Sequence, residues 1–205
     1  IEVTWARLLS IMDEAAATMI RTAYSITIRE SKDLAVVLFD RRGRALAESA
    51  IASPSFLGTL PRTLEAFLST YPISEWQSDD LVITNDPWIV SGHLQDITMA
   101  SPIYLADHLL GFVAISAHGP DIGGSLYSAM SREIFEEGLR IPICRYAKNG
   151  QRNQLVKDFI ESNVEPTSNF KGSPMNFSAS VIYFSAMSIR ILSVSFGASP
   201  SPVKP

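Results

Sequence analysis

Cysteine is nearly absent from this sequence of 205 residues, and long apolar runs are missing altogether. The single cysteine, Cys144, cannot form a disulfide within the chain, which fits a reducing compartment. The most apolar stretch, residues 181–192, contains an arginine and is shorter than the roughly 20 residues that span a bilayer. The first residues also lack the basic and apolar regions of a signal peptide. We therefore expect a soluble, cytoplasmic protein.

Clusters of positive charge are missing as well, and the formal net charge is −4. Proteins that bind DNA or RNA usually carry a basic patch or stripe. Anionic membrane surfaces likewise attract clusters of lysine and arginine. The composition thus predicts neither nucleic acid nor a membrane as a partner, while 46% hydrophobic residues are enough to bury a sizeable core.

Acidic residues stop at Glu165, and serine and proline become frequent after it. This change of composition divides the chain into residues 1–165, the N-terminal part of one domain, and residues 166–205, an atypical Ser/Pro-rich tail outside its core. The sequence also begins on Ile1, already within a helical pattern. We expect an N-terminal fragment with an incomplete C-terminal portion.

Hydrophobic spacing predicts helices and antiparallel hairpins in separate parts of the chain. Apolar residues recur at helical spacing over residues 3–23, and a second helix should open at Pro61 and stop before Pro72. Short helices are expected near residues 131–137 and 153–162. The predicted strands cover residues 34–39, 44–47, 80–84, 96–105 and 109–117. The pattern favours an α+β fold, in which antiparallel hairpins form a mixed sheet with packing helices.

Two similar motifs flank the predicted hairpin of residues 96–117. His93 and Asp96 lie where its first strand starts, and His118 and Asp121 lie where its second strand ends. A hairpin brings these two ends together, so two imidazoles and two carboxylates should meet at one end of a sheet. Nitrogen donors combined with a carboxylate suit Mn, Fe or Zn. The pattern therefore predicts a candidate metal site, although each motif alone is common.

Several of these residues also have simpler interpretations. Asp121 with Gly123 and Gly124 could form an ordinary turn, or the glycines could let the backbone approach a ligand closely. His108 falls in the predicted turn, where a solvated side chain is expected. Cys144 is expected to be packed and inert, because no base is reserved for it.

Six motifs, taken in order, resemble the hydantoinase B and 5-oxoprolinase family. They are residues 21–25 (RTAYS), 28–33 (IRESKD), 85–88 (NDPW), 92–98 (GHLQDIT), 117–124 (AHGPDIGG) and 137–142 (EGLRIP). The likeness extends from about Glu2 to Val164. Two features depart from the family: residues 53–58 replace a histidine-containing segment of many members, and members are usually well over twice this length.

The resemblance implies a site and a set of partners. It assigns His93, Asp96 and His118 as metal ligands for a divalent transition metal, Mn, Fe or Zn. It implies catalytic roles for Asp121, which would orient His118, and for Asp86. Family positions that would contact substrate are Arg29, Glu30, Asp33, Gly123 and Gly124. The family acts with a hydantoinase A-type subunit, which uses ATP to phosphorylate an oxygen of the small-molecule substrate.

The expected function is that of a metal-dependent subunit in an ATP-coupled cyclic-amide hydrolase. It would take part in opening the ring of a hydantoin, an N-methylhydantoin or 5-oxoproline, and this chain alone should be inactive. One alternative is an alpha-type subunit of an acetone or acetophenone carboxylase. Another is a truncated remnant that keeps the fold without turnover.

Overall fold

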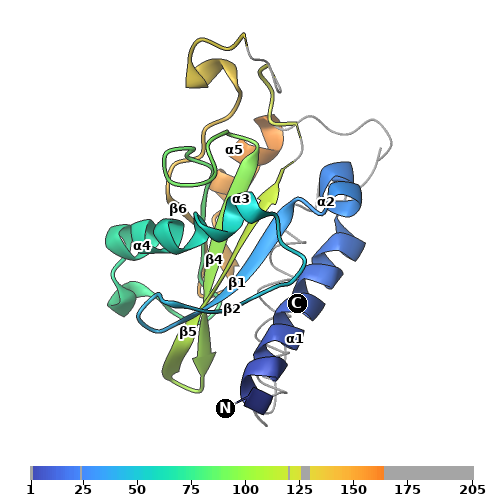
Figure 1. Ribbon diagram of the computed structural model, residues 1–205. Helices are drawn as coiled ribbons and strands as arrows, with labels where there is room; N and C mark the ends of the chain where they lie inside the picture. Colours follow the sequence, from blue (N-terminus) through green and yellow to red (C-terminus); the bar gives the residue numbers. More distant parts are fainter. Residues whose placement is uncertain (1, 24, 120, 126–129, 164–205) are drawn as a thin grey trace.

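The computed structural model describes residues 2–23, 25–119, 121–125 and 130–163 (Figure 1). The boundary expected at residue 165 and the Ser/Pro-rich tail lie outside these residues, so both stay predictions. The elements, in order, are α1 (Glu2–Thr22), α2 (Ile26–Ser31), β1 (Leu34–Asp40), β2 (Ala45–Glu48), α3 (Pro54–Leu57), α4 (Leu60–Thr70), η1 (Ile73–Glu75), β3 (Leu81–Thr84), β4 (Asp96–Leu105), β5 (His108–His118), η2 (Ile134–Glu136), β6 (Cys144–Lys148), β7 (Gln151–Arg152) and α5 (Gln154–Asn163).

The strands form one seven-stranded sheet in the order β2-β1-β5-β4-β3-β6-β7. The α+β class expected from the sequence is confirmed. The sheet itself is antiparallel at all six strand pairings of the described residues, whereas a mixed sheet was expected. Three of these pairings, β1–β2, β4–β5 and β6–β7, join strands connected by a short turn, which reverses the chain direction.

The β4–β5 hairpin is the centre of the sheet. Asp96 pairs with His118 at one end of the hairpin, and Leu105 pairs with His108 at the other. The turn between them contains Ala106 in a left-handed conformation, with φ 52°. The predicted hairpin is therefore confirmed, with its second strand starting one residue earlier than expected.

Helices cover both faces of the sheet (Figure 1). Successive side chains of a strand point to opposite faces, and β1 shows this clearly: Leu34 and Val36 pack in the cluster that contains α1, while Ala35 and Val37 pack with α3 and α4. At the other end of the sheet, α5 contributes Ile160 to a third cluster around β3 and β6. Among the described residues, no helix combines the length and the apolar character needed to cross a membrane.

Some elements were not predicted from the sequence. The short helix α2 begins at Ser25, whose side chain accepts a hydrogen bond from Ile28 N, and ends at Lys32 with φ 54°. The hairpin β6–β7 was missed because its strands are only five and two residues long and mostly partly exposed. The helix expected near residues 131–137 is a single 3-10 turn, η2, whereas the helices expected over residues 3–23, from Pro61, and over residues 153–162 are present.

A buried ion pair joins β6 to the loop before β3. The carboxylate of Asp80 is fully buried and pairs with Arg145 Nη1, whose side chain is 14% exposed. Asp80 also accepts hydrogen bonds from the backbone N–H groups of Gln77 and Asn149. The guanidinium of Arg145 stacks 4.4 Å from the ring centroid of Tyr71. This network fixes the β6 end of the sheet.

We expect Arg145→Met to lower the free energy of unfolding by about 3–5 kcal/mol, because it leaves the buried charge of Asp80 without its partner. Urea denaturation followed by circular dichroism measures the change. The matched control is Arg152→Met on the exposed β7, which should stay within about 0.5 kcal/mol of the original chain. An equal effect of the two substitutions would contradict the role of the ion pair.

Candidate metal centre

Three neighbouring strands bring polar side chains to one end of the sheet. Asp96 begins β4 and is paired with His118, which ends β5. On the other side of β5, the backbone N–H of His118 donates to the carbonyl of Asp33, the residue before β1. Because these three residues occupy equivalent positions across the sheet, their side chains lie on the same face, the one covered by α3 and α4.

The fourth residue, His93, comes from the loop before β4. Its Nε2 lies 3.0 Å from Asp96 Oδ2, and its ring centroid lies 5.6 Å from that of His118. The loop is anchored by the buried side chains of Val90 and Leu94. Gly92 has φ 110°, a backbone conformation that residues other than glycine rarely adopt. This turn lets His93 point back toward the strand that follows it.

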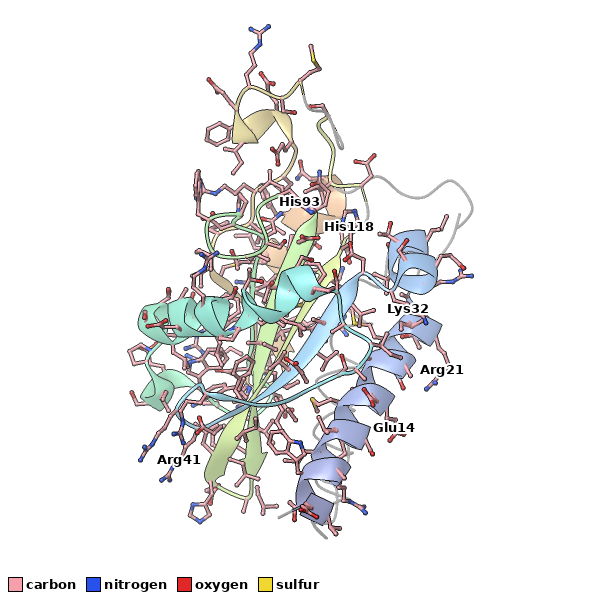
Figure 2. The ribbon with its side chains drawn as sticks, in the orientation of Figure 1. Glu14, Arg21, Lys32, Arg41, His93 and His118 are labelled. Atoms are coloured by element: carbon pink, nitrogen blue, oxygen red, sulfur yellow. The ribbon has the colours of Figure 1, made fainter. Side chains whose placement is uncertain are left out.

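The resulting cluster has the composition of a metal site. One ligand atom each from His93, Asp96 and His118 lies within 4.8 Å of the others. Figure 2 shows the two histidines side by side at the same end of β4 and β5. The side chain of His93 is 39% exposed, whereas those of Asp96 and His118 are buried. The donor set fits a divalent transition metal with one side open to solvent.

The carboxylate of Asp96 is shared between the two imidazoles. Its Oδ1 lies 3.3 Å from His118 Nδ1, and its Oδ2 also accepts a hydrogen bond from the hydroxyl of Ser91. Burial is the largest single influence and raises the pKa of Asp96, but hydrogen bonds from His118, His93 and Ser91 outweigh it, so the pKa is lowered to about 2. The hydrogen bond to Asp96 raises the pKa of His93 above its usual 6.5, against the lowering effect of burial.

These shifts predict a pH window for the stability of the metal-free chain. The contribution of His93 is complete below its unfolded pKa of 6.5 and is lost as the pH rises through its higher folded pKa. The contribution of Asp96 is complete above its unfolded pKa of 3.8 and is lost as the pH falls toward about 2. The original chain should therefore exceed His93→Gln in free energy of unfolding by the largest amount between pH 3.8 and 6.5. Urea denaturation of both proteins with a chelator present measures this difference.

The control for this measurement is His108→Gln, which changes the exposed histidine at the far end of the same hairpin. It should follow the original chain across the pH range. If the difference in free energy of unfolding between the original chain and His93→Gln grew above pH 6.5, the ion pair between His93 and Asp96 would not be its source.

Asp33 was predicted to contact substrate, and the structure places it beside the candidate ligands. Its Oδ2 lies 3.8 Å from His118 Nδ1, and its charge contributes to raising the pKa of His93. Its side chain is 29% exposed. Its position in the row of Asp33, His118 and Asp96 makes it a candidate fourth donor, and its contact with substrate stays a prediction.

Asp121, Gly123 and Gly124 lie in the segment that follows β5. Asp121 Oδ1 accepts a hydrogen bond from the backbone N–H of Gly123. Both glycines have positive φ, and a Cβ on Gly124 would lie 2.5 Å from the carbonyl carbon of Glu137. The structure thus explains Gly124 by close backbone packing. Orientation of His118 by Asp121, and substrate contact by the glycines, stay predictions.

Asp86 lies in the loop between β3 and His93, where it stabilises the loop. Its Oδ2 is 2.5 Å from Arg140 Nη2, and its Oδ1 accepts from the backbone N–H of Trp88 at 3.2 Å. The neighbouring Asn85 is fully buried and donates to the carbonyls of Leu94 and Leu139. A catalytic role for Asp86 stays a prediction.

Arg29 and Glu30 lie on the exposed surface of α2. They form an ion pair at 3.8 Å on α2, with side chains that are 52% and 70% exposed. Both side chains are accessible to a ligand or to another chain. Their contact with substrate stays a prediction, because their mutual ion pair does not test it.

Two polar residues that contact the candidate ligands are not among the predicted site residues, although Ser91 belongs to a polar loop before His93 where functional residues tend to occur. Ser91 donates to Asp96, as described above, and Gln95 Oε1 lies 2.9 Å from His93 Nδ1. Gln95 stands within the GHLQDIT motif, but nothing in its residue type shows that it would be buried. Only its position between two candidate ligands could have drawn attention to it.

Cys144 and a surface hollow lie away from the cluster. Burial raises the pKa of the Cys144 thiol to about 11, which agrees with an inert cysteine.

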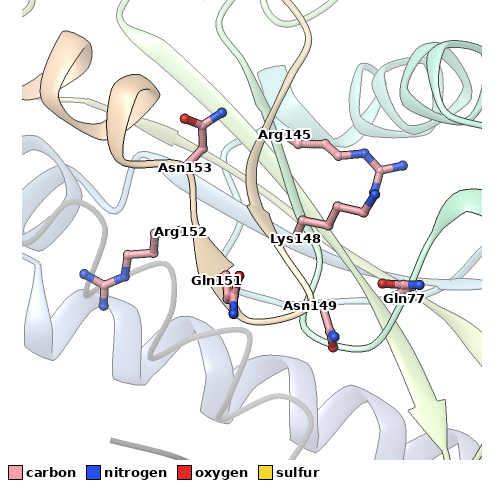
Figure 3. A pocket seen from close by; sticks show the side chains of 7 residues that line it. All are labelled: Gln77, Arg145, Lys148, Asn149, Gln151, Arg152 and Asn153. Carbon is pink, nitrogen blue, oxygen red and sulfur yellow. The ribbon is translucent and has the colours of Figure 1, made fainter.

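The hollow, of about 530 Å³, opens beside the β6–β7 hairpin (Figure 3). It is lined by Gln77, Arg145, Lys148, Asn149, Gln151, Arg152 and Asn153. Arg145 and Arg152 extend in opposite directions in Figure 3, so their charges do not converge on one point.

The fold and the cluster define an α+β domain with a candidate metal centre at one end of an antiparallel sheet. The chain belongs to the hydantoinase B/oxoprolinase family, whose model matches residues 1–182.

Proteins of several organisms are similar to this chain in sequence. An uncharacterized protein of Methanocaldococcus jannaschii is 34% identical over 75% of this chain and 28% of its own length. A 5-oxoprolinase of Dictyostelium discoideum is 32% identical over 76% of this chain and 13% of its own length. A protein of Pseudomonas sp., named as the B-type subunit of a D-/L-hydantoinase, is 28% identical over 80% of this chain and 29% of its own length. The chain therefore spans less than a third of each of these relatives.

Two solved structures share the fold, each with a TM-score of 0.79 over 96% of this chain. One is the ATP-dependent caprolactamase of Pseudomonas jessenii, 22% identical, of which 34% is covered. The other is an acetone carboxylase in its nucleotide-free form, 18% identical, of which 26% is covered.

Proposed function

We propose that this chain forms the metal-binding part of one subunit in an ATP-coupled cyclic-amide hydrolase. The observation that carries the proposal is the cluster of His93, Asp96 and His118 at the end of the β4–β5 hairpin. Membership of the hydantoinase B/oxoprolinase family supports the hydrolase class. Relatives named as a 5-oxoprolinase and as part of a hydantoinase suggest a hydantoin, an N-methylhydantoin or 5-oxoproline as substrate.

The residues of the cluster have distinct tasks in this proposal. His93 would bind the ion through Nε2 and His118 through Nδ1, since these atoms already face the carboxylate of Asp96. Asp96 would bind from within the sheet, and Asp33 would offer a fourth donor from the start of β1. A bound Mn, Fe or Zn ion would polarise a substrate oxygen and lower the pKa of a bound water toward about 7. The exposed side of His93 is where a substrate could approach.

A second type of chain would supply the ATP-dependent activation step. Activation of the amide oxygen with ATP is assigned to a hydantoinase A-type partner, consistent with the relative that is named as a B-type subunit. Because the chain spans 13% to 29% of the relatives described above, we expect no turnover from it alone.

A carboxylase is the second candidate function, because the acetone carboxylase matches the fold as well as the caprolactamase does. An assay of the chain together with the hydantoinase A-type partner and ATP would distinguish the two. Ring opening of a cyclic amide supports the hydrolase, whereas incorporation of labelled bicarbonate into acetone would replace it with the carboxylase.

Metal analysis tests the centre itself. Plasma mass spectrometry on the purified chain should find nearly one equivalent of Mn, Fe or Zn, and the double variant His93→Ala/His118→Ala should lose it. The loss is expected because, within the part of the chain that the structure describes, the cluster would keep Asp96 and the partly exposed Asp33 as its carboxylate donors and no imidazole. Circular dichroism would establish that both proteins are folded.

The matched control is His108→Ala, which removes the exposed histidine at the other end of the same hairpin and should keep the metal. If the folded original chain took up no metal after reconstitution, the assignment of the ligands would be wrong.

A further inference from the structure

Gln95 connects a candidate metal ligand to the backbone of a distant segment. Its side chain is buried, and the residue is 3% exposed. Its Oε1 lies 2.9 Å from His93 Nδ1, and its Nε2 donates to the carbonyl of Glu137 at 3.3 Å. A buried amide of this kind is held at both of its polar atoms.

The contact with Glu137 decides which way the amide points. A backbone carbonyl only accepts hydrogen bonds, so the amide nitrogen of Gln95 must face it. The amide oxygen then faces His93, and since that oxygen also only accepts, His93 Nδ1 must carry a proton. The other ring nitrogen, Nε2, is left facing Asp96, which is the direction in which a metal ion would be bound.

The acceptor at Glu137 is itself held firmly. Residues 122–125 and 136–139 lie side by side, with hydrogen bonds from Ser125 N to the carbonyl of Glu136 and from Leu139 N to the carbonyl of Ile122. Gly124 and Gly138 approach the opposite backbone so closely that a Cβ on either would lie 2.5 Å from its nearest neighbouring atom. The carbonyl of Glu137 therefore has little freedom to move away from Gln95.

We propose that Gln95 is a positioning residue, which holds the ring of His93 with Nε2 toward the metal and links this ligand to the segment 136–139. The proposal depends on the proposed metal centre. A hydrogen bond to the second nitrogen of a metal-binding histidine fixes its tautomer and ring orientation, and the loss of such a partner typically lowers metal affinity 10- to 100-fold.

Three substitutions in the 205-residue chain separate positioning from general loosening. Gln95→Met keeps the length of the side chain but removes the acceptor for His93. Gln95→Glu keeps an acceptor for His93 and serves as the rescue variant. Thr98→Val removes a buried hydrogen bond to Ser116 of 2.8 Å, three residues further along the chain, and is the matched control.

Two measurements follow the ligand directly. Competition with a coloured chelator gives the affinity for Zn²⁺, and the proton NMR spectrum of the zinc-loaded chain shows whether His93 keeps a slowly exchanging ring N–H. We expect Gln95→Met to lower zinc affinity roughly 10- to 100-fold and to lose this resonance. Gln95→Glu should keep the resonance at a shifted position, because a carboxylate accepts more strongly than an amide. Thr98→Val should leave both measurements unchanged.

The other outcomes overturn the proposal in recognisable ways. Unchanged affinity and an intact N–H resonance in Gln95→Met would refute positioning by Gln95 while leaving the metal centre in place. Equal losses of zinc affinity in Gln95→Met and Thr98→Val would show that any buried substitution near the cluster weakens metal binding, and would refute a specific role of Gln95. If Gln95→Met does not fold, the shift in Gln95→Glu decides, and an unshifted resonance refutes the proposal. If the original chain binds no zinc, this inference and the proposed metal centre both fall.

Discussion

The pairing of Asp96 with His118 across the β4–β5 hairpin is the constraint on which the site depends. Side chains along a strand alternate between faces, so a slip of one residue would turn one of the two to the opposite face of the sheet. The register is held by the buried residues of both strands, which pack against helices on both faces of the sheet. The hydrophobic core therefore determines the geometry of the polar cluster.

Burying a carboxylate such as Asp96 has a cost that the cluster must offset. A buried charge is tolerated only when it is paired and hydrogen-bonded, and Asp96 meets two imidazoles and the hydroxyl of Ser91. The contacts of Asp96 with His93, His118 and Ser91 hold the candidate ligands close to one another within the chain.

The sequence predicted the parts of this arrangement that depend on neighbouring residues. The hairpin of residues 96–117 could be recognised because its alternating strands and its turn are local, and both candidate histidines follow from its ends. Asp33 could not be placed in this way. Its position beside His118 depends on the pairing of β1 with β5, two strands that are separated along the chain by β2, α3, α4, η1, β3 and β4. Residue spacing carries no information on a pairing of that range.

Gln95 and Asn85 show a second limit of sequence reasoning. Amide side chains are usually exposed, yet both are buried here, because backbone carbonyls of residues 137–139 accept their hydrogen bonds. Each joins the loop of residues 85–95, which carries His93, to the segment that includes Arg140, the partner of Asp86. The loop that supplies the exposed ligand is consequently fixed to backbone 42 residues away from Gln95.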